Sequence, residues 1–277
     1  MFFTYLCDVR KTFGMKINNI TQEIEQFAPL NLQESYDNAG VQVGDIYQPA
    51  SGVLLALDIT EEIIDEACML GCNLIIAHHP LIFKPLRSLT GKSYIEKCVV
   101  KAIQKGIVIY AAHTNLDSVM NGVSHRLAQK IGLQHIRILR QEKDAGILAQ
   151  TGFGVIGELP SDEEELIFLY HLKDIFGLKL LKHSPLRNKK IKRVAICGGS
   201  GAFLIPDAIA SKADVLITGE AKYNDFYNVE KTILLSVIGH YESEVCTKEI
   251  FFEIITKKFP NFAVHFSNIN TNPVNYL

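Results

Sequence analysis

The segment NLIIAHHP at residues 73–80 joins a short apolar run to a pair of histidines. Four apolar residues bounded by polar ones are typical of a strand that is buried on both faces of a sheet. Two other segments have the same design, VLLALD at residues 53–58 and IVIYAAHTNLD at residues 107–117. We therefore predict buried strands whose ends carry polar side chains.

Helical patterns separate these strands. Apolar residues recur at three-to-four spacing over residues 17–27, and helices are also expected after Thr60, over 94–105 and over 123–131, with Gly132 as a stop. Further along, we expect an extended segment at 146–159, a helix led by acidic residues at 162–176, and strands at 193–197, 214–217, 232–238 and 262–266. This alternation predicts an α/β sheet covered by helices on both faces.

Composition narrows the class of protein. The 277 residues carry 28 Lys and Arg against 30 Asp and Glu, a formal net charge of −2, and 48% are hydrophobic. The balanced charge argues against a polybasic nucleic-acid arm, and the apolar content argues against disorder. No apolar run reaches the roughly 18 residues that span a bilayer, so no membrane is expected as a partner. Because the charge is balanced, no nucleic acid is expected as a partner either. We expect residues 1–14 to be an extension with little structural role.

Six cysteines are present, and none forms a CxxC pair. Cys68 and Cys72 are four residues apart among apolar neighbours, which is helical spacing. We favour buried thiols over a metal or redox role. Free thiols are typical of a reducing compartment, so a cytoplasmic location is expected.

Polar residues gather where the predicted strands stop. His78 and His79, the segment 113–117, Glu220 and the segment 240–244 each follow an apolar strand directly. Ligand sites in α/β sheets lie at the carboxyl ends of strands. Several such clusters, rich in His, Asp and Glu, indicate one shared metal site.

Spacing allows a ligand set to be assigned. Neighbouring residues of an extended chain point to opposite sides, so His78 and His79 either bind different ions or one of them is not a ligand. His240 and Glu244 are four apart and share a face if a helix begins near residue 239. With Asp117 turning inward from a loop, the five residues form a set for two divalent ions, and Glu244 is favoured as the shared carboxylate.

Charge indicates what such a site attracts. Two divalent cations and two carboxylates leave a net +2, which favours hydroxide or a phosphate-like anion and is typical of a metal-assisted hydrolase. These ligand types suit Zn, Fe, Mn, Co or Ni. The glycine-rich segment GGSG at residues 198–201 has two interpretations, a phosphate-binding loop or a tight strand-to-helix turn, and we favour the turn.

Five segments together resemble the family of GTP cyclohydrolase 1 type 2 homologues, also called the NIF-three-like dinuclear metal-binding proteins. They are DNAGVQVG at 37–44, AHHPLIF at 77–83, AHTNLD at 112–117, TGE at 218–220 and GHYESE at 239–244. The resemblance extends over nearly the whole chain from about residue 16. Its metal ligands correspond to the five residues assigned above: His78, His79, Asp117, His240 and Glu244.

The resemblance also implies an architecture. It implies two α/β domains with mixed sheets covered by helices, and a metal site in the cleft between the domains. We place the first domain at 15–140 together with 238–277, and the second at 141–237. The resemblance further implies a ring-shaped homohexamer, and the chain is similar to the compact members that lack an inserted middle domain.

Two functions follow as expectations. The first is a metal-dependent hydrolase that acts on a nucleotide or a related anionic heterocycle. In that case His113 is a candidate catalytic residue for proton transfer or substrate contact, with a structural hydrogen bond as the alternative, and Glu220 lines the cleft. The second is a non-catalytic metal-handling or regulatory protein with the same ligands.

Overall fold

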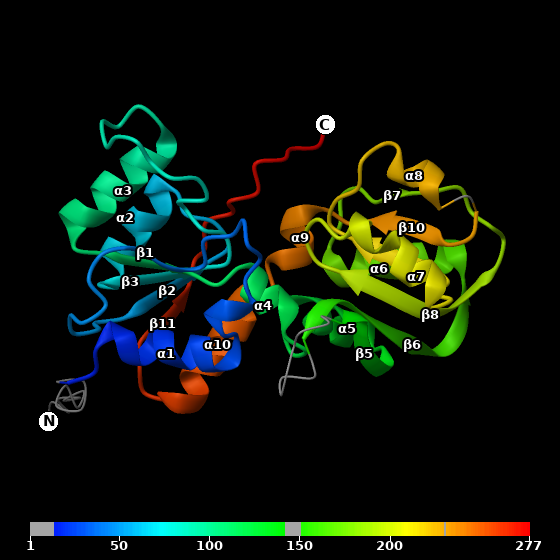
Figure 1. Ribbon diagram of the computed structural model, residues 1–277, viewed down its shortest axis with the longest axis horizontal. Coiled ribbons are helices and arrows are strands. Elements are labelled where there is room, and N and C mark those ends of the chain that lie inside the picture. Colours follow the sequence, from blue (N-terminus) through cyan, green and yellow to red (C-terminus); the bar gives the residue numbers. More distant parts are fainter. Residues whose placement is uncertain (1–13, 142–150, 230) are drawn as a thin grey trace, which may run out of the picture. The chain divides into compact units, whose positions relative to one another are not determined.

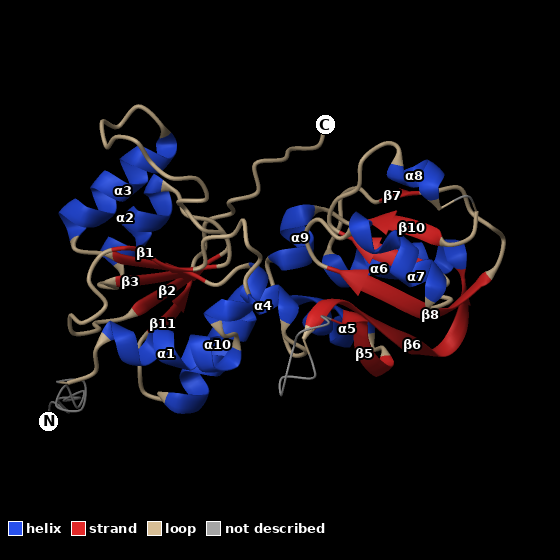
Figure 2. Cartoon of the chain, viewed as in Figure 1, coloured by secondary structure: helices blue, strands red, loops and turns tan. Residues whose placement is uncertain are grey.

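The computed structural model describes residues 14–141, 151–229 and 231–277. It divides into two compact units, Met1–His113 with Phe251–Thr271, and Thr114–Ile250 with Asn272–Leu277. Each unit contains one β-sheet with helices packed against it (Figures 1 and 2). Nearly all of the expected extension at residues 1–14 lies outside the described residues.

The first unit is built on a five-stranded sheet in the order β1-β4-β3-β2-β11. The strands are β1 (Gly40–Val43), β2 (Val53–Ala56), β3 (Leu74–Ala77), β4 (Val108–Ala111) and β11 (Val264–Phe266). The helices are α1 (Ile17–Phe27), η2 (Leu30–Leu32), α2 (Glu61–Met69), α3 (Tyr94–Lys105) and most of α10 (Thr247–Lys258). The edge strand β1 runs antiparallel to β4, whereas the other pairs are parallel.

Both faces of this sheet are covered, which explains the uninterrupted apolar strands. Alternate residues of β2 and β3, such as Leu54 and Ile75, share one core with the inner sides of α2 and α3. On the opposite face, the fully buried Tyr110 of β4 donates its hydroxyl to Oε1 of Glu25 in α1, at 3.1 Å. Figure 1 shows α1 across the sheet from α2 and α3. Since side chains alternate between faces, strands covered on both sides need apolar residues at every position.

The second unit contains a six-stranded sheet in the order β5-β6-β8-β9-β10-β7. The strands are β5 (Gln134–Gln141), β6 (Gly152–Glu164), β7 (Lys182–His183), β8 (Lys190–Cys197), β9 (Val215–Thr218) and β10 (Leu234–Val237). The helices are α4 (Thr114–Ser118), α5 (Val123–Ile131), α6 (Glu165–Phe176), η3 (Ala202–Leu204), α7 (Ile205–Ala210), α8 (Asp225–Asn228) and α9 (His240–Glu244). β8, β9 and β10 are mutually parallel, and the remaining pairs are antiparallel.

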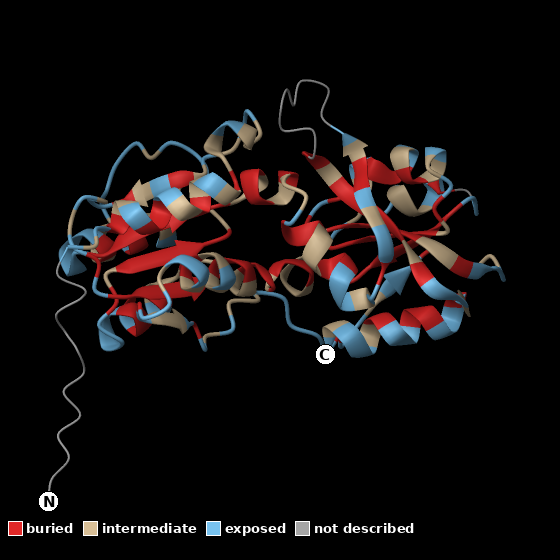
Figure 3. Ribbon diagram, turned by 90° about the horizontal axis from the view of Figure 1, so that it is seen from below, coloured by how far each residue is buried: buried red, intermediate tan, exposed pale blue. Residues whose placement is uncertain are grey.

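The core of the second unit follows the same principle. The three parallel strands contribute Ala195, Leu216 and Leu235 to this core. These residues pack with Leu204, which precedes α7, and with Ala208, which belongs to α7. The buried strands of both sheets are visible in Figure 3. An α/β architecture with mixed sheets covered by helices is therefore confirmed.

Several details differ from the expectations. The acidic residues 162–164 end strand β6, and helix α6 begins only at Glu165. The edge strand β5 and helix α10 were not predicted. In the described part of the chain, no helix combines the length and apolar character that crossing a bilayer requires. The predicted domain limits stay a prediction.

Candidate metal centre

In the first unit, strand register brings polar residues from three loops together. Ala56 of β2 is paired with Ala77 of β3, which is paired with Ala111 of β4. The three strands are parallel, so their carboxyl ends lie side by side. The residues that follow these ends include Asp58, the pair His78 and His79, and His113.

The side chains of the three histidines converge. One ring nitrogen from each of His78, His79 and His113 lies within 4.8 Å of the others, and the ring centroids are 5.1 to 5.5 Å apart. Adjacent residues can share this space because β3 ends at Ala77, so the alternation of a strand no longer applies to His78 and His79. The expectation that their side chains point to opposite sides is therefore wrong.

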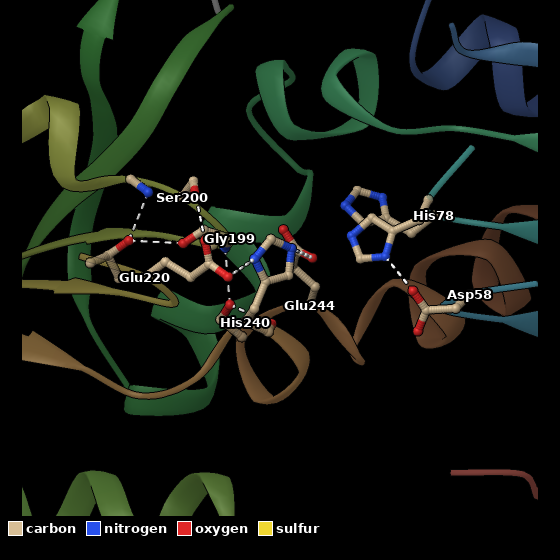
Figure 4. A network of polar contacts seen from close by, with 12 residues as sticks. Asp58, His78, Gly199, Ser200, Glu220, His240 and Glu244 are labelled. Atoms are coloured by element: carbon tan, nitrogen blue, oxygen red, sulfur yellow. Dashed lines mark hydrogen bonds and ion pairs between the residues drawn. The ribbon is translucent and has the colours of Figure 1, made fainter. Parts of the chain in front are cut away.

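In each of these histidines, Nδ1 contacts an oxygen atom. Nδ1 of His78 lies 2.8 Å from the carbonyl oxygen of Ala112. Nδ1 of His79 lies 2.7 Å from Oδ1 of Asp58, which is labelled in Figure 4. Nδ1 of His113 lies 2.8 Å from Oδ1 of Asp37. A carbonyl or carboxylate oxygen accepts, so Nδ1 carries the proton and Nε2 presents its lone pair. Oxygen partners of this kind orient metal-binding histidines.

The second unit repeats the arrangement with different side chains. Cys197 of β8 is paired with Thr218 of β9, which is paired with Val237 of β10. The loops that follow these three parallel strands carry the GGSG segment at 198–201, Glu220, and the start of α9 at His240. Their carboxyl ends again lie side by side.

His240 and Glu244 approach each other across one turn of α9. Nε2 of His240 lies 2.9 Å from Oε2 of Glu244, and Nδ1 lies 3.1 Å from Oε1 of Glu220. The other oxygen of Glu220 accepts from the hydroxyl of Ser200 at 2.8 Å (Figure 4). A carboxylate oxygen of Asp117 lies within 4.8 Å of one of Glu244. Asp117 was expected in a loop, but it belongs to the short helix α4.

Glu244 is held beside a loop that has no room for a side chain. A Cβ atom on Gly199 would lie 2.2 Å from Oε1 of Glu244, and Gly199 has φ +57°, which favours glycine. The buried Ser243 fixes the same loop, because its Oγ accepts from the amide of Gly199 at 3.0 Å and donates to the carbonyl of His240 at 2.8 Å. The sequence places Ser243 between two candidate ligands, which is the one signal that could have identified it.

The GGSG segment forms a tight turn. The amide of Gly198 donates to Oγ of Ser124, that of Gly199 to Oγ of Ser243, and that of Gly201 to Oγ1 of Thr218. Three of its four amides are thus committed to side chains of the same unit. This supports the strand-to-helix turn over a phosphate-binding loop, which needs amides that face the ligand.

Burial and the two acidic candidate ligands raise the pKa of a neighbouring thiol. Burial raises the pKa of Cys197 to about 12, and the charges of Asp117 and Glu244 add to the increase. A thiol in this environment stays protonated and is a poor metal ligand. Buried thiols were expected throughout, and Cys72, Cys98, Cys197 and Cys246 are buried, but Cys68 is exposed on α2.

The donor set of each unit fits a borderline divalent metal ion. Imidazole nitrogens with fixed tautomers in the first unit, and a buried carboxylate beside an imidazole in the second, are the ligand types that Zn, Fe, Mn, Co and Ni share. Sequence reasoning did not identify Asp37 and Asp58, which orient His113 and His79. Only the folded register reveals these pairs.

Comparisons with known proteins place this chain in one family. Residues 15–273 match the family model described as Duf34/NIF3 (NGG1p interacting factor 3). The chain is 36% identical over 267 residues to a GTP cyclohydrolase 1 type 2 homolog of Lactococcus lactis, covering 94% of this chain and 98% of the relative. It also resembles the crystal structure of the hypothetical protein SA1388 of Staphylococcus aureus, with a TM-score of 0.87, 31% identity, and 95% and 99% of the two chains covered.

A further relative confirms the compact form. A GTP cyclohydrolase 1 type 2 homolog of Staphylococcus aureus strain MSSA476 is 29% identical in an alignment of 368 positions that covers 95% of this chain and all of the relative. Because this chain has 277 residues, the relative carries internal residues that have no counterpart here. The resemblance predicted from the sequence motifs is confirmed.

Proposed function

Given that this chain belongs to the Duf34/NIF3 family, we propose that it is a dinuclear metal-binding hydrolase. Its substrate is a nucleotide or a related anionic heterocycle. The ligands of the two ions are His78, His79, Asp117, His240 and Glu244. Curated relatives named GTP cyclohydrolase 1 type 2 homolog support this substrate class.

One observation carries the proposal. In the three histidines of the first unit, Nδ1 contacts an oxygen atom, at 2.7 to 2.8 Å, so Nε2 is the ring nitrogen that would bind a metal ion. Histidines that serve only as hydrogen-bonding residues have no reason to share one orientation. Prior orientation removes the cost of ordering each ring when the ion binds.

The residues of the chain have separate tasks in this reaction. When bound, divalent ions lower the pKa of water to about 7 and polarise the substrate. Asp117 and Glu244 offset part of the cationic charge and leave a net positive site that attracts an anion. His113 is held at Nδ1 by Asp37, so its Nε2 can accept a proton or contact the substrate.

Turnover distinguishes a hydrolase from a metal-handling protein. Metal-loaded protein is assayed against nucleotides and phosphoesters, with formate and phosphate release as readouts. Hydrolysis that is lost in Glu244→Gln supports the proposal. The matched control is Glu242→Gln on the same helix, because Glu242 accepts from Nδ2 of Asn272 and has no ligand role in the proposal. Metal binding without turnover on any substrate would contradict the hydrolase and favour metal handling.

We also propose that the protein assembles as a ring-shaped homohexamer in the cytoplasm. The assembly rests on the family resemblance. Light scattering coupled to size-exclusion chromatography tests it, with a mass of six chains as the expected result. A monomer or dimer at micromolar concentration would contradict the ring.

A further inference from the structure

A cavity of about 1080 Å³ lies within the second unit, beside the carboxyl ends of β8 and β9. Residues of the turn after β8 and of α7 form one part of its wall, and residues that follow β9 form another. Its volume is at the upper end of the range for small-molecule sites. None of the five proposed metal ligands lines it.

The wall contributed by α7 and the preceding turn is apolar. Phe203, Pro206 and Ile209 line the cavity. The ring of Phe203 is 48% exposed, yet it is held in place by the ring of Phe153 at 5.6 Å and by the guanidinium of Arg140 at 5.1 Å. A fixed and accessible aromatic ring is a surface on which a planar heterocycle can stack.

The charged groups in the cavity are cations without partners and anions with partners. Lys182 and Lys222 both line it, and among the described residues neither ammonium group has an ion-pair partner. Glu220, by contrast, faces His240 and accepts from Ser200. Asp225 accepts from the backbone amide of Lys222 at 2.7 Å. The four charged side chains of the lining sum to zero, and the two ammonium groups are the contacts that it offers to an anion.

The cavity is connected to the candidate metal centre within the same unit. Ser200 and Glu220 both line the cavity, and Glu220 lies 3.1 Å from Nδ1 of His240. The carboxylate of Glu220 thus separates a ligand in the cavity from the ring of His240, a proposed metal ligand. Such a position is suited to a substrate rather than to a remote effector.

We propose that this cavity is the binding site for the substrate of the metal centre, with the planar heterocycle against Phe203 and its anionic group on Lys182 and Lys222. The inference rests on the proposed function for the identity of its ligand. It adds the place where the anionic nucleotide binds and the residues that select it. Hydrophobic contact with the base and charge attraction to the phosphates contribute separately.

Photoaffinity labelling tests the location. Full-length, metal-loaded protein is labelled with 8-azido-GTP, and the modified peptides are identified by mass spectrometry. We expect labelling within residues 200–228 that GTP suppresses. Competition by guanosine or by inorganic triphosphate should each be about tenfold or more weaker than by GTP, because each retains only one of the two contacts. Labelling confined to other peptides, or not suppressed by GTP, would overturn the proposal.

Charge-matched variants test the residues. Lys182→Ala combined with Lys222→Ala should weaken GTP competition at least about tenfold. The control pair Lys189→Ala and Lys190→Ala removes two exposed lysines of the same unit that do not line the cavity, and should leave competition unchanged. Equal affinity in both pairs would overturn the proposal. Phe203→Ala should weaken competition by guanosine but not by triphosphate.

Metal content is measured on every variant, which separates this proposal from the preceding one. The lysine and Phe203 variants should keep the metal content of the wild-type protein. Site-specific labelling without any turnover would leave the binding site intact and contradict the hydrolase. Turnover that is unaffected by the lysine pair would contradict the binding site and leave the hydrolase intact.

Discussion

The two units use the same backbone device to present different chemistry. In each, three adjacent parallel strands end in register, β2, β3 and β4 in one and β8, β9 and β10 in the other. The first unit presents three imidazoles, of which two are oriented by carboxylates and one by a backbone carbonyl. The second presents carboxylates and one imidazole, packed against glycine turns. Strand register therefore determines where the polar side chains gather, whereas the residues that follow each strand determine which chemical groups are offered there.

The different side chains of the two units have an electrostatic consequence. An imidazole adds no negative charge to a metal site, so what the first unit could contribute to metal affinity depends on the orientation of its rings. The second unit supplies the negative charge, in Asp117 and the buried Glu244, so its contribution depends on keeping those carboxylates in place.

The largest expected effect concerns a buried ion pair in the second unit. Glu165 accepts from Nε of Arg187 at 2.7 Å and from the amides of Arg187 and Asn188. Both side chains are at most 4% exposed. Glu165→Ala leaves a buried guanidinium unpaired, so we expect a loss of about 3–5 kcal/mol in the free energy of unfolding, measured by urea denaturation.

The matching variant in the first unit is Glu66→Ala. Glu66 accepts from Oγ of Ser267 at 2.5 Å and from the amide of Asn268 at 3.0 Å. Both of these donors are neutral, so the loss should be smaller, about 1–3 kcal/mol. A larger loss for Glu66→Ala than for Glu165→Ala would contradict this ranking.

A glycine substitution tests how the second unit holds its ligand. Gly199→Ala should displace the carboxylate of Glu244, which a Cβ would approach to 2.2 Å, and should lower metal affinity about 10–100-fold. The control is Gly177→Ala, where φ is +61° but no atom lies within 4 Å of the new Cβ. That variant should cost only about 1–2 kcal/mol of backbone strain and keep its metal. Equal metal affinity in the two variants, measured by chelator competition, would contradict the account.

Removing an orienting carboxylate tests the first unit. Asp58→Asn replaces the acceptor of His79 Nδ1–H by a weaker amide and should lower metal affinity by about tenfold or more. Asp37→Asn changes the partner of His113, which is not among the five proposed ligands, so metal affinity should hold while turnover falls. If Asp37→Asn instead releases metal, His113 is a ligand and not a catalytic residue.

The smallest effect concerns the thiols of the first unit. Burial raises the pKa of Cys72 and of Cys98 from 9.0 to about 11, whereas Cys68 is exposed. At pH 8 a maleimide should therefore modify Cys68 much faster than the two buried cysteines, as peptide mass mapping would show. Fast modification of Cys98 in the folded protein would contradict its burial.

The same shifts give a pH dependence of stability. A thiol with a raised pKa binds its proton more tightly in the folded state than in the unfolded state. The contribution of this proton to the free energy of unfolding is fully present below about pH 9 and is lost as the pH rises towards 11. The melting temperature should decrease over that interval, and Cys98→Ser, which removes one of these groups, should make the decrease shallower.

The elements that the sequence predicted best have local signals. Helix 94–105 begins where Ser93 caps it and ends at Gly106, which has φ +67°. Strand β5 was missed because it mixes exposed and buried residues at a sheet edge, without the clean alternation or the apolar run that marks a strand. The acidic residues 162–164 were assigned to the start of a helix, although Glu163 and Glu164 pair with β8.

The site was predictable to the extent that its residues follow strands directly. The histidines after β3 and β4 do so, and could be assigned before any fold was known. Their orienting partners could not. Asp37 lies 76 residues from His113 in the chain, and Asp58 lies 21 residues from His79, so only strand register brings each pair together. The cavity beside Glu220 depends on loop packing, which no local pattern encodes.

The central claim is that this chain holds two divalent ions, and elemental analysis of the purified protein at a known chain concentration tests it most directly. The account predicts two transition-metal ions per chain in the wild-type protein and in Glu242→Gln, and a marked loss in Glu244→Gln. Wild-type protein that retains no metal after purification in metal-supplemented buffer, or a Glu244→Gln variant that retains two ions, would contradict it.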